Sequence, residues 1–338
     1  MAFLLITERG YDILSTTGDK THVNHQRRGK HMSGELTELQ LIEEIERLKK
    51  EKNAILLAHN YQIPEIQKVA DIVGDSLKLS QEAAKAEAHM ILLSGVHFMA
   101  ESVKILSPQK KVILPVADAG CPMAEMVDAE RLREFKREYP GAPVVCYVNS
   151  SAEVKAESHI CCTSSNAVSV VKSLDADKVL FVPDKNLGHY VQMQIPEKEI
   201  ISWEGFCITH HRVKTKAIDT AKKLHPDAPI LAHPECAPEV VQRADFVGST
   251  SQIIRRAGEM DSQSFIIGTE MGILHQLEQN NPEKKFYLLS EDLYCLNMKK
   301  TNLKSIYNAL MKEEKEIFVD EDIRLAALVT LERMLKVQ

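Results

Sequence analysis

One pattern of residues occurs three times along this chain, and it constrains the fold more than any other feature. In each copy an apolar run leads to polar residues, then to a Glu followed by an aliphatic residue, and then to a hydroxyl residue. The Glu residues lie 88 and 86 residues apart and are Glu65, Glu153 and Glu239. The hydroxyl residues repeat these two intervals and are Ser76, Ser164 and Thr250. A period this long exceeds that of solenoid repeats, so it indicates three related small α/β units.

Helix-like and strand-like segments alternate within each copy. Amphipathic helices are predicted at 36–52, 129–139 and 213–224, and a further one at 301–315 is expected to cap the last unit. The clearest later strands are predicted at 90–94, 179–182 and 265–268. Strands that alternate with helices of this length predict parallel sheets covered on both faces. We therefore predict an α/β protein of three αβα units, related by a pseudo-threefold axis around a central cavity.

The repeat also predicts how the chain is divided. The expected units are residues 34–125, 126–211 and 212–298, followed by C-terminal capping helices over 299–338. Residues 1–33 lack apolar periodicity and end in a basic, histidine-containing stretch. We expect this segment to be an expression-derived or disordered extension.

Composition excludes several classes of protein. The 338 residues carry a net charge of −6, which argues against a general nucleic-acid surface. No apolar run is long enough to span a bilayer. The seven cysteines, an odd number, indicate reduced thiols rather than a disulfide framework. We expect a cytoplasmic protein that binds neither nucleic acid nor membrane.

Three of the cysteines follow the repeat. They lie 86 and 88 residues apart and are Cys121, Cys207 and Cys295. Equivalent loops of three related units can bring their thiolates together on one axis. Three thiolates without a fourth match an iron–sulfur cubane with one open iron, whereas structural zinc takes four protein ligands. An open iron can act as a Lewis acid, which favours dehydration chemistry.

The remaining cysteines have no counterparts in the repeat. Buried, inert thiols are expected for Cys146 and Cys236. The vicinal pair Cys161 and Cys162 could bind a metal ion.

Polar residues recur at the predicted carboxyl ends of the strands. The first layer is His59, Tyr147 and His233, and the second layer is Tyr61, Asn149 and Glu235. The third layer is the hydroxyl set given above. Those hydroxyls could be ordinary helix N-caps. Alternatively, three helix N-termini around one cavity could bind phosphate or carboxylate.

The polar layers allow two further interpretations. His59, His233 and Glu235 could form a zinc site, because two histidines and a carboxylate are a known catalytic set. Tyr61 and Glu235 could instead act as an acid/base pair in a cavity that excludes water.

These residues resemble the quinolinate synthase family, from about Leu36 to the C-terminus and in the same order. The stretches that carry the resemblance are His59-Asn60-Tyr61, Val73-Gly74-Asp75-Ser76, Gly120-Cys121-Pro122-Met123, Tyr147-Val148-Asn149-Ser150, Cys162-Thr163-Ser164-Ser165-Asn166, His233-Pro234-Glu235-Cys236 and Gly248-Ser249-Thr250-Ser251. Cys207 with His210, and Cys295 with Asn297-Met298-Lys299, extend it.

The resemblance implies three αβα units around a central [4Fe–4S] cluster held by Cys121, Cys207 and Cys295. It implies condensation of iminoaspartate with dihydroxyacetone phosphate to quinolinate, with loss of phosphate and two waters, in NAD biosynthesis. An L-aspartate oxidase or dehydrogenase would supply the iminoaspartate. The implied substrate-binding residues are His59, Ser76, Tyr147, Asn149, Ser164, His233, Glu235 and Thr250. The implied catalytic residues are Tyr61, Glu235 and His233, and His210 is expected to shape the cavity.

The third cysteine region departs from the family pattern. Many members carry C-x-x-C-x-x-C there, whereas Cys295 stands alone with Met298 three residues on, so a regulatory disulfide at this place is excluded. Leu296 replaces an expected proline. Two other functions stay open from the residues themselves: a zinc-dependent aldolase or hydrolase, and a non-catalytic iron–sulfur sensor.

Overall fold

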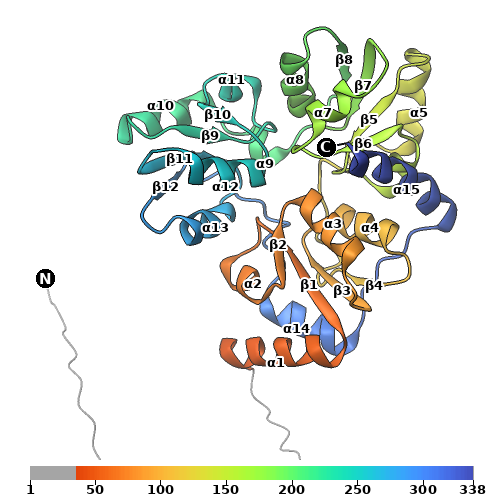
Figure 1. Ribbon diagram of the computed structural model, residues 1–338, viewed down its shortest axis with the longest axis vertical. Coiled ribbons are helices and arrows are strands. Elements are labelled where there is room, and N and C mark those ends of the chain that lie inside the picture. The colour runs from red at the N-terminus through yellow and green to blue at the C-terminus, as the bar shows by residue number, and fades with distance from the viewer. Residues whose placement is uncertain (1–35, 338) are drawn as a thin grey trace, which may run out of the picture. The chain divides into compact units, whose positions relative to one another are not determined.

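The computed structural model describes residues 36–337, which contain three parallel four-stranded sheets with helices between the strands (Figure 1). The predicted α/β fold of three αβα units is thereby confirmed. The expectation for residues 1–33 concerns residues outside the described range.

The elements of the three units follow one another in the same order. The first unit contains α1 (Glu38–Glu51), β1 (Ala54–His59), α2 (Pro64–Val69), β2 (Ile72–Gly74), α3 (Ser76–Lys85), β3 (Met90–Ser94), α4 (His97–Leu106) and β4 (Lys111–Ile113). The second contains α5 (Ala129–Glu138), β5 (Val144–Tyr147), α6 (Ala152–Ala156), β6 (Ile160–Cys162), α7 (Ala167–Lys172), β7 (Lys178–Val182), α8 (Lys185–Gln194) and β8 (Glu199–Ser202). After the short α9 (Ile208–His211), the third contains α10 (Thr215–Leu224), β9 (Ile230–Ala232), α11 (Pro238–Val241), β10 (Phe246–Val247), α12 (Thr250–Glu259), β11 (Ser264–Gly268), α13 (Ile273–Asn280) and β12 (Lys285–Leu288).

The three sheets share one strand order. The orders are β2-β1-β3-β4, β6-β5-β7-β8 and β10-β9-β11-β12, and every strand pair is parallel. Equivalent contacts fix the register of the first strand in the first and third units. Leu56 N–H donates to Asp71 Oδ2, and Ile230 N–H donates to Asp245 Oδ2, each at 2.7 Å. Because all strands of a sheet run the same way, the polar residues that follow β1, β5 and β9 lie at the carboxyl edges, where α/β proteins place their ligands.

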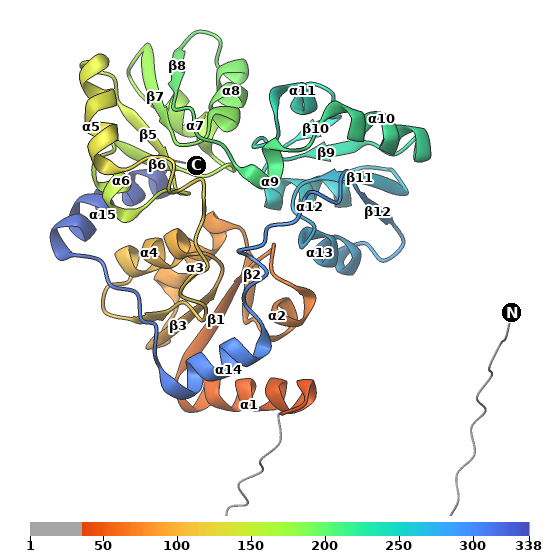
Figure 2. The ribbon, with the colours of Figure 1, turned by 180° about the vertical axis from the view of Figure 1, so that it is seen from behind.

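The first helix after the third unit lies elsewhere than predicted. α14 (Leu303–Lys312) packs against α1 of the first unit, and both views show the two helices side by side (Figures 1 and 2). Its Leu303, Ile306 and Leu310 share a buried apolar cluster with Ile45 and Leu48 of α1. The expectation that this helix caps the last unit is therefore wrong. Periodicity identified the apolar face of the helix but not its partner.

The last helix crosses to the second unit. α15 (Glu321–Lys336) packs on α6 and β6, with Ala327 and Leu331 in the apolar core that the first two units share. The chain end thus returns to the middle of the repeat series. None of the helices in the described part of the chain is long and apolar enough to cross a membrane.

Candidate active site

A single cavity of about 260 Å³ collects the residues singled out from the sequence. All twelve candidate residues line it: His59, Tyr61, Ser76, Cys121, Tyr147, Asn149, Ser164, Cys207, His233, Glu235, Thr250 and Cys295. They come from all three units, and each lies at or beyond the carboxyl end of a strand or near the start of a helix. The repeat alignment therefore predicted which residues meet.

The two histidines of the first layer are held in the same way. His59 Nδ1 accepts the N–H of Tyr61 at 3.1 Å, and His233 Nδ1 accepts the N–H of Glu235 at 3.3 Å. An Nδ1 that accepts leaves the proton of the neutral ring on Nε2. Burial lowers the pKa of His59 to about 4 and that of His233 to about 3, so both rings are neutral at neutral pH. Each ring therefore presents an Nε2–H donor, and that of His233 lies 3.2 Å from Ser164 Oγ.

This tautomer weakens the zinc interpretation of His59, His233 and Glu235. A metal ion on Nε2 would move the ring proton to Nδ1, where it would face the backbone N–H that Nδ1 now accepts. Both histidines would then have to give up the contact that orients them.

The third layer does not cap helices. The N-cap of α3 is Asp75, whose side chain accepts from Lys78 N–H, and the N-cap of α12 is Ser249, which accepts from Gln252 N–H. Ser76 and Thr250 are the first helical residues, and Ser164 lies before Asn166, the N-cap of α7. The N-cap interpretation of Ser76, Ser164 and Thr250 is therefore wrong. Their hydroxyls line the cavity while other residues begin the helices.

Glu235 lies at one end of a chain of hydrogen bonds. It is buried, with Oε1 2.7 Å from the Tyr147 hydroxyl and Oε2 2.8 Å from His210 Nδ1. Burial raises the pKa of Glu235. The nearby histidines and the hydrogen bonds from His210 and Tyr147 lower it by more than burial raises it, so the pKa is about 2. The carboxylate is therefore ionised at neutral pH, although burial alone would favour its protonated form.

Tyr61 lies at the other end of the same chain. Its hydroxyl is 2.7 Å from Thr269 Oγ1 and accepts from Thr250 Oγ1 at 2.9 Å. Thr269 Oγ1 is in turn 3.0 Å from His210 Nε2. Burial and the nearby Glu235 raise the pKa of Tyr61 well above its ordinary value, so the phenol stays protonated. The two candidate acid/base groups are thus connected through Thr269 and His210.

Asn149 has an unmet requirement. Its buried Oδ1 has no hydrogen-bond partner among the described residues, and the side chain lines the cavity. A buried amide oxygen without a partner in a cavity indicates the place of a ligand donor.

The three repeat cysteines share one local geometry. All three are half-buried, line the cavity and face a backbone N–H three residues on, from Ala124, His210 and Met298 respectively. Burial raises the pKa of all three thiols, that of Cys121 to about 12. Such thiols become thiolates when a bound cation replaces the proton, and N–H groups aimed at sulfur suit iron–sulfur ligation. These residues therefore fit a metal cluster with three cysteine ligands.

Comparison with known proteins decides the family. Residues 43–336 match the family described as Quinolinate synthetase A protein. The quinolinate synthase of Alkaliphilus metalliredigens is 66% identical over 303 residues, which cover 90% of this chain and 100% of that protein. Those of Caldicellulosiruptor bescii and Thermodesulfovibrio yellowstonii are 55% and 52% identical, each over 87% of this chain and 97% of the relative. The chain belongs to the quinolinate synthase family.

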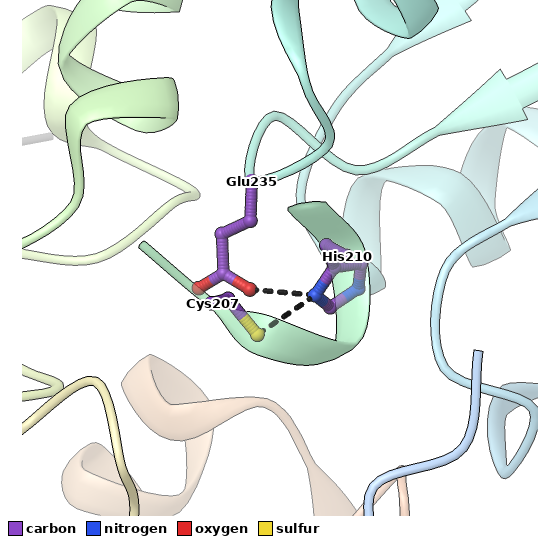
Figure 3. A group of neighbouring side chains, drawn as sticks. All are labelled: Cys207, His210 and Glu235. Carbon is purple, nitrogen blue, oxygen red and sulfur yellow. Dashed lines mark hydrogen bonds and ion pairs between the residues drawn. The ribbon is translucent and has the colours of Figure 1, made fainter. Parts of the chain in front are cut away.

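In this family member, one group of side chains offers ligand atoms at metal-binding distance. Among the described residues, Cys207, His210 and Glu235 have ligand atoms within 4.8 Å of one another (Figure 3). His210 Nδ1 lies between the Cys207 sulfur, at 3.2 Å, and the Glu235 carboxylate. The group could hold a metal ion, and it brings one repeat cysteine next to the acid/base chain.

Two features of the site escaped the sequence reasoning. Thr269 completes the chain of hydrogen bonds, yet its equivalent position in the second unit is Pro183, so the repeat gave no signal. Ser165 Oγ lies 3.1 Å from Asp75 Oδ2 and 2.8 Å from Ser249 Oγ, joining the three units at the helix starts. Polar residues in the stretches around the three hydroxyls were a signal for this second feature.

The remaining cysteines lie in the protein core. Cys146, Cys161, Cys162 and Cys236 are all buried, as expected for Cys146 and Cys236. Cys161 and Cys162 are successive residues of β6 and so face opposite sides of the sheet, which prevents them from holding one metal ion together.

Proposed function

We propose that this quinolinate synthase family member condenses iminoaspartate with dihydroxyacetone phosphate to quinolinate, releasing phosphate and two waters. We further propose that Cys121, Cys207 and Cys295 hold a [4Fe–4S] cluster. The observation that supports this most is that three equivalent cysteine loops line the same cavity as the hydrogen-bonded acid/base chain. When bound, such a cluster supplies an iron without a protein ligand, which is a Lewis acid for loss of a hydroxyl.

Neutral donors of the cavity bind the anionic groups of the substrates. The Nε2–H of His59 donates to a carboxylate, while that of His233 donates to Ser164 Oγ and leaves the Ser164 proton for the substrate. The Ser76 hydroxyl adds a second donor at a helix start, and Thr250, whose proton goes to Tyr61, lines the cavity beside it. Helix N-termini stabilise phosphate and carboxylate without a basic surface. This suits a chain with a net charge of −6.

Tyr61 and Glu235 transfer protons. Glu235 is ionised at neutral pH and can accept a proton, while the protonated phenol of Tyr61 can donate one. Asn149 orients the substrate through its unpartnered oxygen. Burial of Tyr61 and Glu235 also excludes water, which would hydrolyse an imine.

Cellular setting and partners follow from this chemistry. Three free thiols that are to hold a cluster require a reducing compartment, so we place the protein in the cytoplasm. An enzyme that oxidises L-aspartate, an oxidase or a dehydrogenase, would supply the iminoaspartate.

Anaerobic purification tests the proposal. We expect a brown, oxygen-labile protein with about four irons and four sulfides per chain. It should form quinolinate from the two substrates. A colourless zinc protein would refute the cluster and favour an aldolase or hydrolase. A fully loaded cluster protein without turnover would refute the enzymatic function and favour a sensor.

A further inference from the structure

Each cysteine loop is tied to its sheet by a backbone bridge that repeats in all three units. In every unit, the N–H of a residue near the carboxyl end of the third strand donates to the carbonyl two residues before the cysteine. The three bridges run from His97 N to Ala119 O at 2.8 Å, from Lys185 N to Gly205 O at 2.8 Å, and from Met271 N to Leu293 O at 2.9 Å. The main chain therefore offers all three cysteines the same support.

The residue just before each donor breaks this symmetry. It is Asp184 in the second unit and Glu270 in the third, 86 residues apart as the repeat requires, but Val96 in the first. Both carboxyl groups are fully buried. Fully buried acids are rare unless their oxygens are paired, so these two positions require an explanation.

Asp184 accepts more hydrogen bonds than capping of α8 requires. Its Oδ1 accepts the N–H groups of Asn186 and Leu187 at 2.8 and 2.9 Å, which caps α8. Its Oδ2 accepts the N–H of Cys207 at 3.2 Å. One oxygen thus serves the helix and the other serves the cysteine.

Glu270 divides its oxygens in the same way. Oε2 accepts the N–H of Gly272 at 2.7 Å, next to the start of α13, and Oε1 accepts the N–H of Cys295 at 3.0 Å. Lys299 Nζ lies 2.8 Å from the carboxylate and also contacts the carbonyl oxygen of Tyr61. The buried negative charge is therefore balanced by an ammonium group that reaches the loop of a catalytic candidate.

Side chains of different length reach the same backbone atom in two units. A helix cap alone would not explain this, because the oxygen that bonds the cysteine is not the one that bonds the helix. We propose that Asp184 and Glu270 are positioning residues that fix the main chain of Cys207 and Cys295, so that both sulfurs face the cluster. This inference rests on the proposed [4Fe–4S] function.

Substitution of each acid by its isosteric amide tests this positioning role. In Asp184→Asn the amide oxygen can still cap α8, since Asn is a good N-cap, but the amide nitrogen then faces the Cys207 N–H. In Glu270→Gln the same conflict arises at Cys295, and Lys299 loses its charged partner. The double variant Glu270→Gln with Lys299→Met removes the lone ammonium if the single variant fails to fold.

The matched controls are acids three residues before the same cysteines. Glu204→Gln and Asp292→Asn change exposed carboxylates on the two loops and should behave as wild type. Asp184→Ser is the second variant at the first position, because Ser caps a helix but is too short to reach Cys207.

Two measurements are made on each protein. The first is iron release from the anaerobically loaded protein to a chelator, which should be roughly 10–100-fold faster in the amide variants, as for other residues that hold metal ligands in place. The second is alkylation of the metal-free protein by iodoacetamide, mapped by mass spectrometry. The affected cysteine should react several-fold faster, while Cys121, whose loop has Val96, serves as the unchanged internal reference.

The outcomes separate the two proposals. Wild-type protein that takes up no iron and sulfide refutes the proposed cluster, whereas the alkylation pattern still tests the positioning role. A cluster-loaded variant that releases iron at the wild-type rate overturns the inference. Equal acceleration at all three cysteines overturns it as well, because that pattern reports general loosening of the fold.

Discussion

Glu235→Gln is the substitution that examines the proposed chemistry most directly. In the wild-type protein the carboxylate accepts from the Tyr147 hydroxyl at 2.7 Å and from His210 Nδ1 at 2.8 Å. Glutamine has almost the same shape but only one acceptor oxygen, and its NH₂ group must face one of these two donors. The variant therefore loses its basic group and one buried hydrogen bond at the same time.

The two losses have separate magnitudes. A buried donor left without its acceptor costs about 1–3 kcal/mol of folding free energy. In a chain of this size each kcal/mol lowers the melting temperature by about 2–4 °C. Loss of a general base should lower turnover at least roughly 10²-fold, or about 2.7 kcal/mol in activation free energy.

The assay measures quinolinate formation under anaerobic conditions, at a temperature well below the melting point of the variant. Cluster content and dicarboxylate binding are measured on the same samples and should match wild type. Glu239→Gln, an exposed acid four residues on, is the control and should leave turnover unchanged. Wild-type turnover in Glu235→Gln with a full cluster would refute the assignment, even if the melting temperature fell as predicted.

Three other predictions concern the cysteines, the hydroxyls and pH. Alanine at Cys121, Cys207 or Cys295 should abolish the cluster absorbance, whereas alanine at Cys146, Cys161 or Cys236 should keep it; an indispensable core cysteine would contradict the repeat argument. Ser76→Ala should weaken dicarboxylate binding by about 1–3 kcal/mol but change the unfolding free energy by less than about 0.5 kcal/mol, because Asp75 is the cap; calorimetric binding equal to wild type would contradict this. Because His59 and His233 have folded-state pKa values of about 4 and 3, below the ordinary 6.5, the unfolded chain binds more protons, and stability present above pH 6.5 should fall as the pH is lowered. Between pH 6.5 and 5 the loss should be about 1.6 kcal/mol for each histidine, measured by urea unfolding, and a flat profile would show that folding does not lower the pKa values of these rings.

The sequence predicted the contents of the cavity because the repeat makes distant positions equivalent. Residues such as His59 and His233 are 174 residues apart, yet both lie at the carboxyl end of the first strand of a unit and so at equivalent edges. Hydrophobic periodicity alone places a strand but not its partner. The equivalence of the three first strands showed which distant residues should lie together.

Details at the level of one residue were beyond the same reasoning. Asp75-Ser76 and Ser249-Thr250 each offer two residues able to cap a helix, and only backbone geometry decides which does. In both cases the first residue caps, which leaves the second free for a ligand. Tertiary packing of α14 was also unpredictable, because its apolar face fits any apolar partner and its position next to α1 depends on the path of the connecting chain.

The site shows how a symmetric scaffold serves an asymmetric reaction. The units present their residues from equivalent positions, so any difference between substrate groups must be matched by side-chain differences. His59 and His233 keep one orientation device, an Nδ1 that accepts the N–H two residues on. The second unit has Tyr147 there instead, and its hydroxyl reaches across to Glu235.

The presence of Tyr147 in place of a histidine has a physical consequence. A third histidine would add only another neutral donor, whereas the phenol reaches Glu235 in the third unit and helps keep it ionised. The second layer differs in the same sense: Tyr61 offers a phenol, Asn149 an amide and Glu235 a carboxylate, which we propose act as acid, orienting group and base. Only two of these three can transfer a proton, and the chain of hydrogen bonds through Thr269 and His210 joins those two while the Asn149 oxygen has no partner in the described range 36–337. Substitution of Asn149 should therefore disturb substrate orientation and leave the connection between Tyr61 and Glu235 intact.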